Sequence, residues 1–521
     1  MIDSWFPPDG VQCTSDVITV AASMFKAREF RCPAADALKA RGCRPAQLGS
    51  HRRELLQHFP LGPFMAACDG HAGLPSTPPG RPSPPLHEGL RVWTEHAVAA
   101  YRAAFADDAD RTLGDDASPW VYRHRPTTRD QRGAREYRLT VWGRRLRSAD
   151  GSVCELRLPV NRLHSEPPPA AFVAVAALVL AEGVREPLPE RVRIIEFALL
   201  DGRTRVLADD TRDEALARYR EHGPAALTAV LDTHEYRPGP VCVDCPFLAS
   251  CPAVRKSTGL LGVASEGRPR RTWSVTNGRN YRDCPARDHM RRLHLPAADS
   301  IERGSAAERG RAIHTYLADR HGRGDARPCT VDVPAHWVPE GYDLPASERD
   351  LGATLLRRHA AVCPLQRIGD MTDVRVEPRV VRHDTAADIL VLAVPDLLYR
   401  DNASWVWRET KTTATTPWAG RPLLERYPQL ALAVMLLARG DLGGEPRRAR
   451  VELEVLRPDG ADLEIIDPFA PATRASAGRI ITALVAGWSG DDHYAPTPGR
   501  ACRRCEVAQW CTSAASLEVT E

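Results

Sequence analysis

Several features are scarce in this 521-residue chain, and each scarcity excludes a class of protein. The longest apolar run, residues 170–181, is too short to cross a bilayer, which argues against a helical membrane protein. Only four of the 70 basic residues are lysines, and none of them stands in a Gly-Lys-Ser/Thr sequence, so the chain has no P-loop and is not itself a helicase or ATPase. The His-Glu-x-x-His and Gly-x-Ser-x-Gly motifs of common metalloproteases and serine hydrolases are also missing.

The overall charge gives little information about partners, because 70 basic residues face 67 acidic ones. A net charge of +3 creates no global field toward nucleic acid or a membrane, so any basic surface must be local. The chain opens with an acidic, proline-rich segment and lacks the basic and then apolar pattern of a signal peptide, which predicts a cytoplasmic protein. In a reducing compartment, 14 cysteines are expected to include metal or cluster ligands rather than a disulfide framework.

Comparison of the chain with itself indicates an internal duplication. The segments PGPVCVDCPFLASC (238–251) and PGRACRRCEVAQWC (498–511) share Pro-Gly followed by Cys-x2-Cys-x5-Cys. A lone cysteine before a proline precedes each triplet by roughly 210 to 220 residues, at Cys32 and at Cys284. The same order of anchors in both halves predicts two homologous units.

The regions between these anchors also match. Residues 171–202 and 430–460 each read as an apolar helix followed by an alternating strand that ends in Asp-Gly. We therefore predict an α/β fold with tandem domains at 1–255 and 273–521. The basic stretch 256–272 reads as an exposed linker between them.

The cysteine pattern predicts two centres with four ligands each. A Cys-x2-Cys pair brings two thiolates to one centre, a third cysteine lies six positions later, and the lone upstream cysteine supplies the fourth. The expected sets are Cys32, Cys242, Cys245 and Cys251 in the first domain, and Cys284, Cys502, Cys505 and Cys511 in the second. Structural zinc and buried free thiols are the alternatives, and spacing alone does not separate zinc from an iron-sulfur cluster. The remaining cysteines, 13, 43, 68, 154, 329 and 363, show no ligand spacing and read as core or surface thiols.

A second group of polar residues lies on a predicted hairpin. Glu409 and Lys411 are two residues apart on one strand and share a face, and Asp396 lies at the matching part of the preceding strand. Two carboxylates can hold Mg2+, and a lysine beside the metal can stabilise charge that develops on a phosphate. In a chain with so few lysines, the retention of Lys411 suggests a role that arginine cannot fill. The alternative is an exposed strand with cross-strand ion pairs.

These residues resemble a known family. VPD at 394–396, ETK at 409–411 and YPQLALAVMLL from Tyr427 are similar to successive motifs of the PD-(D/E)XK nuclease superfamily in its RecB-like branch. ERGRAIHTYL at 308–317 resembles the Gly-x-x-x-His helix of that branch. One cysteine before the nuclease core and three after it resemble the arrangement in AddB-type and CRISPR-associated RecB-like nucleases, whose four thiolates bind a 4Fe-4S cluster.

The resemblance implies a fold and a set of roles. The fold would be restriction-endonuclease-like, a mixed central sheet flanked by helices, closed by a four-cysteine 4Fe-4S staple. Mg2+ or Mn2+ would be bound by His314, Asp396 and Glu409, Lys411 would be the catalytic lysine, and Gln429 with Tyr427 would position the active site or DNA. Glu377, in VRVEPRVV, is a weaker candidate for a further acidic member.

The first half departs from this pattern, because it contains no Glu-x-Lys pair. Alignment of the repeats puts Phe172 opposite Gln429, Gly143 near the place of Asp396, and Trp93 in the place of His314. We therefore interpret residues 1–255 as a degenerate nuclease-like domain that keeps its cluster ligands. Its cluster rests on the internal repeat and not on the resemblance.

The function hypothesis is a Mg2+- or Mn2+-dependent DNA nuclease with one or two 4Fe-4S clusters, an exonuclease on single-stranded or end-bearing DNA, that acts in DNA repair or antiviral defence. Because no motor is encoded, a separate helicase or ATPase subunit is an expected partner by analogy. Arginines at 268–271 and 279–292 are compatible either with a single-stranded DNA track or with a solvated linker. The competing hypothesis is a non-catalytic iron-sulfur scaffold that binds nucleic acid.

Overall fold

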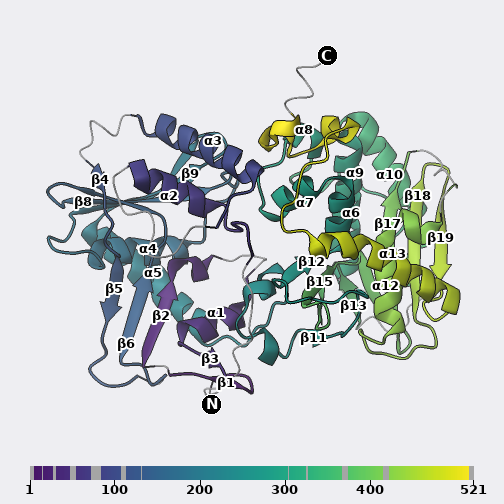
Figure 1. The fold of residues 1–521 in the computed structure, drawn as a ribbon, viewed down its shortest axis with the longest axis horizontal. Coiled ribbons are helices and arrows are strands. Elements are labelled where there is room, and N and C mark those ends of the chain that lie inside the picture. The colour runs from purple at the N-terminus through teal and green to yellow at the C-terminus, as the bar shows by residue number, and fades with distance from the viewer. Residues whose placement is uncertain are drawn as a thin grey trace. The chain divides into compact units, whose positions relative to one another are not determined.

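The structure is a computed structural model, and it divides into two compact units (Figure 1). The first comprises residues 1–253, 289–296 and 510–521, and the second comprises residues 254–288 and 297–509. No helix in the described part of the chain is long and apolar enough to span a membrane. The residues described are 5–14, 16–26, 31–46, 54–71, 84–106, 113–130, 132–302, 304–323, 327–366, 373–414, 420 and 422–514.

The first unit contains a mixed five-stranded sheet in the order β10-β9-β8-β7-β4. All neighbours are antiparallel except β8 and β9, which are parallel and are connected through helix α4. The strands are β4 (Leu113–Asp115), β7 (Arg144–Ser148), β8 (Val153–Val160), β9 (Arg191–Ala198) and β10 (Thr204–Thr211), and the helices are α1 (Pro33–Ala40), α2 (Leu61–His71), α3 (Glu88–Ala104), α4 (Ala170–Glu182) and α5 (Arg212–Leu231).

The second unit contains a five-stranded sheet with the same order and directions, β13-β16-β17-β18-β19. Here β17 and β18 are the parallel pair, connected through α12, and the other neighbours are antiparallel. The strands are β13 (Val374–Val376), β16 (Leu397–Asp401), β17 (Ser404–Thr412), β18 (Arg450–Arg457) and β19 (Gly460–Ile466). The helices are α6 (Val275–Asp283), α7 (Pro285–Arg292, which continues past the division between the units), α8 (Asp299–Glu302), α9 (Ser305–Gly322), α10 (Ala346–His359), α11 (Leu423–Arg426), α12 (Pro428–Ala438) and α13 (Pro471–Gly490).

A smaller sheet accompanies each large one. In the first unit β2 (Val17–Ala21) runs parallel to β6 (Glu136–Thr140), and β5 (Val121–His124) pairs antiparallel with β6. In the second unit β12 (Arg271–Trp273) runs parallel to β15 (Ile389–Ala393), which pairs antiparallel with β14 (Val380–Asp384). Additional short strands are β1 (Val11–Gln12) with β3 (Arg44–Pro45), and β11 (Arg255–Lys256) with β14.

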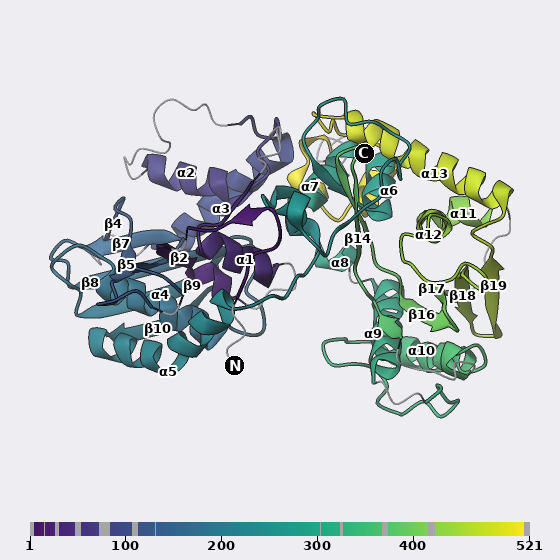
Figure 2. The same cartoon turned by 90° about the horizontal axis from the view of Figure 1, so that it is seen from below.

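The central helix of each unit is buried because it is apolar on all sides. Every residue of α4 from Phe172 to Ala181 is buried, and α12 begins with Pro428 in its first turn, where a missing backbone N–H costs nothing. Trp405 and Trp407 of β17 point into the same core as α12. Figure 2 shows α12 and α13 on one side of β17 to β19 and α10 on the other side.

Residues 256–272 differ from the expected exposed linker, because they belong to the second unit. Their ends lie in strands β11 and β12, and Leu260 and Leu261 are fully buried in its core. The Asp384 carboxylate, also fully buried, accepts hydrogen bonds from the backbone N–H of Gly259 (2.8 Å) and Leu261 (2.7 Å). These bonds satisfy backbone groups that burial would otherwise leave unpaired.

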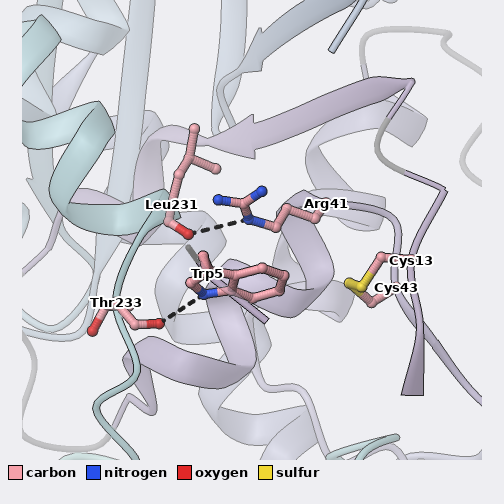
Figure 3. The surroundings of a disulfide bond; sticks show 6 residues. All are labelled: Trp5, Cys13, Arg41, Cys43, Leu231 and Thr233. Carbon is pink, nitrogen blue, oxygen red and sulfur yellow. Dashed lines mark hydrogen bonds between the residues drawn. A yellow bond between two sulfur atoms is a disulfide. The ribbon is translucent and has the colours of Figure 1, made fainter. Parts of the chain in front are cut away.

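A disulfide joins Cys13 to Cys43 in the first unit (Figure 3), where the sequence predicted core or surface thiols. Close to it, the Arg41 guanidinium stacks over the Trp5 ring at 4.0 Å and donates to the carbonyl of Leu231 at 3.2 Å. The Trp5 indole donates to the carbonyl of Thr233 at 3.1 Å. The N-terminal segment is thereby attached to the end of α5.

We expect Asp384→Ala to destabilise the segment 257–262 by about 3 kcal/mol, because two or more backbone N–H groups lose a charged acceptor. Hydrogen-deuterium exchange of this segment should accelerate strongly. Asp462→Ala, which removes an exposed partner of Arg457, is the control and should change exchange little. Unchanged protection at Gly259 and Leu261 would show that the carboxylate does not hold this segment.

Candidate functional site

The structure brings His314, Asp396 and Lys411 together at one end of the large sheet in the second unit. Asp396 directly precedes β16, Lys411 lies on β17, and His314 lies on α9. His314 Nδ1 is 3.2 Å from Asp396 Oδ1, and Lys411 Nζ is 3.7 Å from Asp396 Oδ2. The backbone N–H of Thr410 donates to Asp396 Oδ2 at 2.6 Å, so the β16–β17 pairing fixes this carboxylate against the neighbouring strand.

Glu409 occupies the most enclosed position of the predicted set. Its side chain is 6% exposed, against 22% to 30% for Asp396, His314 and Lys411. Oε1 accepts from the Trp407 indole N–H at 3.0 Å, and Oε2 lies 3.3 Å from Lys411 Nζ. Burial and the nearby negative charge of Asp396 raise the pKa of Glu409 to about 7.

Opposite charges shift the pKa values of the other three groups. Burial opposes charge on each, but the opposite charges outweigh it: Asp396 raises the pKa of His314, and Asp396 with Glu409 raises the pKa of Lys411. The hydrogen bond and charge of His314, followed by Lys411, lower the pKa of Asp396. The opposite charges of these side chains offset one another, and solvent still reaches Asp396, His314 and Lys411.

Glu377 joins this group, although its sequence motif is weak. Donor atoms of His314, Glu377 and Asp396 all lie within 4.8 Å of one another. Glu377 has a backbone φ of +43°, which is costly for a residue with a side chain, and its N–H donates to the Asp396 carbonyl at 3.3 Å. The sequence signal was a glutamate before a proline directly after a strand, a pattern that is common without any function.

Tyr427 and Gln429 lie where α11 meets α12. Tyr427 caps both helices, and Gln429 is a half-buried residue in the first turn of α12. Tyr427 is near enough to Lys411 to influence its charge, and Arg426 stacks over the Tyr427 ring at 5.2 Å.

The first cysteine quartet lines one cavity of about 290 Å³ in the first unit. Cys32 caps α1, and the other three cysteines lie in or next to two 3-10 turns, Pro240–Asp244 and Leu248–Ser250. Backbone N–H groups of Arg237 and Gly239 donate to Sγ of Cys32 (3.5 Å) and of Cys242 (3.3 Å). Arg31, Asp36 and Lys39 also line the cavity: Arg31 pairs with Asp36 at 2.8 Å, and the positive charge of Lys39 favours the thiolate form of Cys245.

The second quartet repeats this local structure. Cys284 lies between α6 and α7, and Cys502 and Cys505 lie in and after the 3-10 turn Arg500–Arg504. The N–H of Thr497 donates to Cys284 Sγ at 3.4 Å, the counterpart of the bond to Cys32. Cys511 follows the turn Ala508–Trp510. Burial raises the pKa of Cys242 and of Cys505 to about 11, so each is a neutral thiol at pH 7 unless a bound metal displaces its proton.

The first unit lacks the acidic and lysine side chains at the matching positions. The β8–β9 and β17–β18 ladders align Val153 with Val406, which puts Leu156 and Leu158 at the places of Glu409 and Lys411. Both leucines are buried in the core beside α4. Arg145 pairs with Leu156, so Arg145 rather than Gly143 corresponds to Asp396.

The arginines at 268–271 are engaged in internal ion pairs. Arg270 pairs with Asp388 at 2.7 Å, and Arg271 pairs with Asp492 at 2.6 Å. Arg268 donates to the carbonyl of Gly490. These contacts favour a structural role over a free DNA track for this cluster.

Comparison with known proteins assigns the second half of the chain to a family. Residues 272–512 match the model of the PD-(D/E)XK nuclease superfamily. This range includes His314, Glu377, Asp396, Glu409 and Lys411. A solved structure titled "Crystal structure of SSO0001" is similar at 14% identity, over 47% of this chain and 86% of that chain, with a TM-score of 0.23. No curated protein matches.

Residues 272–512 are therefore a PD-(D/E)XK nuclease superfamily domain, and the mixed α/β architecture of the second unit agrees with that fold. Proteins of this superfamily are generally metal-dependent nucleases, so the substrate class is nucleic acid.

We expect the affinity of this site for Mn2+ to increase about tenfold from pH 6 to pH 8. The reason is that Glu409 must lose a proton before it binds a cation, and its pKa is about 7. As the pH falls through 7, the Glu409 carboxylate is protonated and the affinity for Mn2+ decreases. Isothermal titration calorimetry at three pH values measures this, and Glu409→Gln should weaken the dependence and leave the part that comes from the deprotonation of His314. Equal affinities at pH 6 and pH 8 would contradict the assignment.

Proposed function

We propose that this protein is a Mg2+- or Mn2+-dependent deoxyribonuclease whose active site is His314, Asp396, Glu409 and Lys411. The main support is the convergence of an imidazole, two carboxylates and an ammonium group at one end of β17, inside a PD-(D/E)XK superfamily domain. An exonuclease that acts on single-stranded or end-bearing DNA is the form of the activity that we favour.

The donor set fits a divalent cation. Carboxylate oxygens of Asp396 and Glu409 and a ring nitrogen of His314 would hold it, and exposed Glu377 offers one further oxygen. When bound, a divalent cation would activate a water molecule and neutralise charge on the phosphate.

The chain's own residues supply the remaining chemistry. Lys411 stays protonated because Asp396 and Glu409 raise its pKa, and its ammonium can donate hydrogen bonds to a phosphate oxygen as negative charge develops there. The Thr410 N–H holds Asp396 in one orientation. Gln429 and Tyr427, on the adjoining helix, would position the DNA or the lysine.

We also propose that each cysteine quartet binds a 4Fe-4S cluster. In the first unit this is supported by four thiols that line one cavity, backbone N–H groups directed at sulfur, and the positive charge of Lys39 beside Cys245.

The first unit would then be a degenerate copy with a structural or DNA-binding role. The identical strand order of the two large sheets supports the duplication, and Leu156 and Leu158 in place of Glu409 and Lys411 support the absence of a catalytic site in that copy. DNA repair or antiviral defence is the setting that we favour. A separate helicase or ATPase subunit would supply any unwinding.

We expect Asp396→Ala and Lys411→Ala each to reduce cleavage of end-labelled DNA by at least about 100-fold. Lys256→Ala, which removes an exposed lysine on β11, is the matched control and should retain activity. The assay compares single- and double-stranded substrates with Mg2+ and with Mn2+, using anaerobically purified protein. Tight DNA binding without cleavage under either metal would favour the alternative, a non-catalytic iron-sulfur scaffold.

For the clusters, we expect about eight iron atoms per chain after anaerobic purification. Cys245→Ser and Cys505→Ser should each remove about four, because each damages one cluster. Cys68→Ser, which removes a buried thiol outside both quartets, should leave iron unchanged. Two zinc ions in place of iron would refute the cluster assignment.

A further inference from the structure

Two histidines and two cysteines of the second unit converge outside the sites described above. His321 lies in the last turn of α9, and Cys329 lies in the segment that follows. His359 is the last residue of α10, and Cys363 is four residues further along. All four side chains are buried, with 1% to 8% of their surface exposed.

Their distances match the edges of a tetrahedron around one zinc ion. The two Nε2 atoms are 3.3 Å apart, and His321 Nε2 is 3.6 Å from Cys329 Sγ and 3.8 Å from Cys363 Sγ. All four donor atoms lie within 4.8 Å of one another. Zinc bonds of about 2.05 Å to nitrogen and about 2.3 Å to sulfur imply edges of about 3.3 Å between nitrogens and about 3.6 Å between nitrogen and sulfur.

The charged groups recorded beside these donors each reach one of them: Glu454 contacts His359, and Arg320 lies near Cys329. The group lies in an apolar cluster with Ile313, Leu317, Leu355 and Leu365. Two imidazole nitrogens at 3.3 Å can be joined by one shared proton or by one cation that both of them bind. A single cation at the centre would satisfy all four donors.

The orientation of His359 is the one that a metal-binding histidine adopts. Its Nδ1 lies 2.6 Å from Oε1 of Glu454, a fully buried carboxylate on β18, which leaves Nε2 directed at the other three donors. Metal-bound histidines usually present their second ring nitrogen to a carboxylate in this way, because the hydrogen bond fixes the tautomer.

We propose that His321, Cys329, His359 and Cys363 bind one structural Zn2+. Two thiolates and two neutral imidazoles balance the charge of the ion, and binding releases the two thiol protons. The softer nitrogen and sulfur ligands select Zn2+ over the Mg2+ or Mn2+ of the carboxylate site. Four protein ligands leave no open position, so the ion has a structural rather than a catalytic role.

The location in the chain explains what the ion would stabilise. The connection from α9 to β13 spans residues 323–373, whereas the corresponding connection from α3 to β4 in the first unit spans only residues 105–112. The ion would join the end of α9 and the start of this connection to the end of α10. Glu454 also accepts from the Thr410 hydroxyl (3.3 Å), and the Thr410 N–H donates to Asp396 (2.6 Å), so the zinc site adjoins the catalytic strand.

The test is the metal content of the full-length chain, purified without chelators and analysed for zinc and iron by mass spectrometry. Wild type should contain about one zinc per chain. Cys329→Ser and Cys363→Ser should each reduce zinc at least fivefold and leave iron unchanged. The matched controls, Cys68→Ser and Cys154→Ser, remove buried thiols of the first unit and should retain zinc.

If these variants fail to fold, X-ray absorption at the zinc edge of wild type gives an independent answer. The expected result is two sulfur ligands at about 2.3 Å and two nitrogen ligands at about 2.05 Å. Four sulfur ligands would mean that zinc occupies a cysteine quartet, and the proposal would be wrong. A chain that neither contains zinc nor takes it up, or a Cys363→Ser variant with full zinc, would also overturn it.

Discussion

The site depends on one backbone hydrogen bond, from the Thr410 N–H to the Asp396 carboxylate across the start of the β16–β17 pairing. This bond holds the carboxylate beside the strand that carries Glu409 and Lys411, and the lysine then lies between two negative charges. His314, which lies on α9, contacts Asp396 and is the fourth member of the group. The position of a carboxylate is thus fixed by sheet geometry, which is more rigid than a loop.

The two units show how one scaffold can carry different chemistry. Both large sheets have the same strand order and directions. In both units the apolar helix that connects the two parallel strands is buried in the core. In the first unit, Leu156 and Leu158 extend the core into the positions that Glu409 and Lys411 occupy in the second. Substitutions at a few positions of one scaffold thus separate a candidate active site from an apolar core, so fold alone does not establish activity.

Arg408 and Glu454 form a buried charged network on the face of the second sheet that packs against α10. Glu454 is fully buried, contacts His359 on the α10 side and lies 3.6 Å from Arg408, which also pairs with Glu452. Buried charges of this kind persist when each has a partner, since removal of one partner leaves the other uncompensated. The network links the proposed zinc site to β17, so loss of the zinc would disturb the strand behind the nuclease site.

The sequence by itself determined the repeat, the cysteine spacing and the nuclease motif, because these are patterns of neighbouring residues along the chain. It also indicated the α/β class through periodic apolar segments. Tertiary structure decided which residues meet across long separations: Glu377 with His314, Cys13 with Cys43, Leu261 with Asp384, and His321 with Cys363. His321, Cys329, His359 and Cys363 have no regular ligand spacing, and only the packing of α9 against α10 brings them together. The physical reason is that a ligand set is defined by distance in space, which chain order constrains only over a few residues.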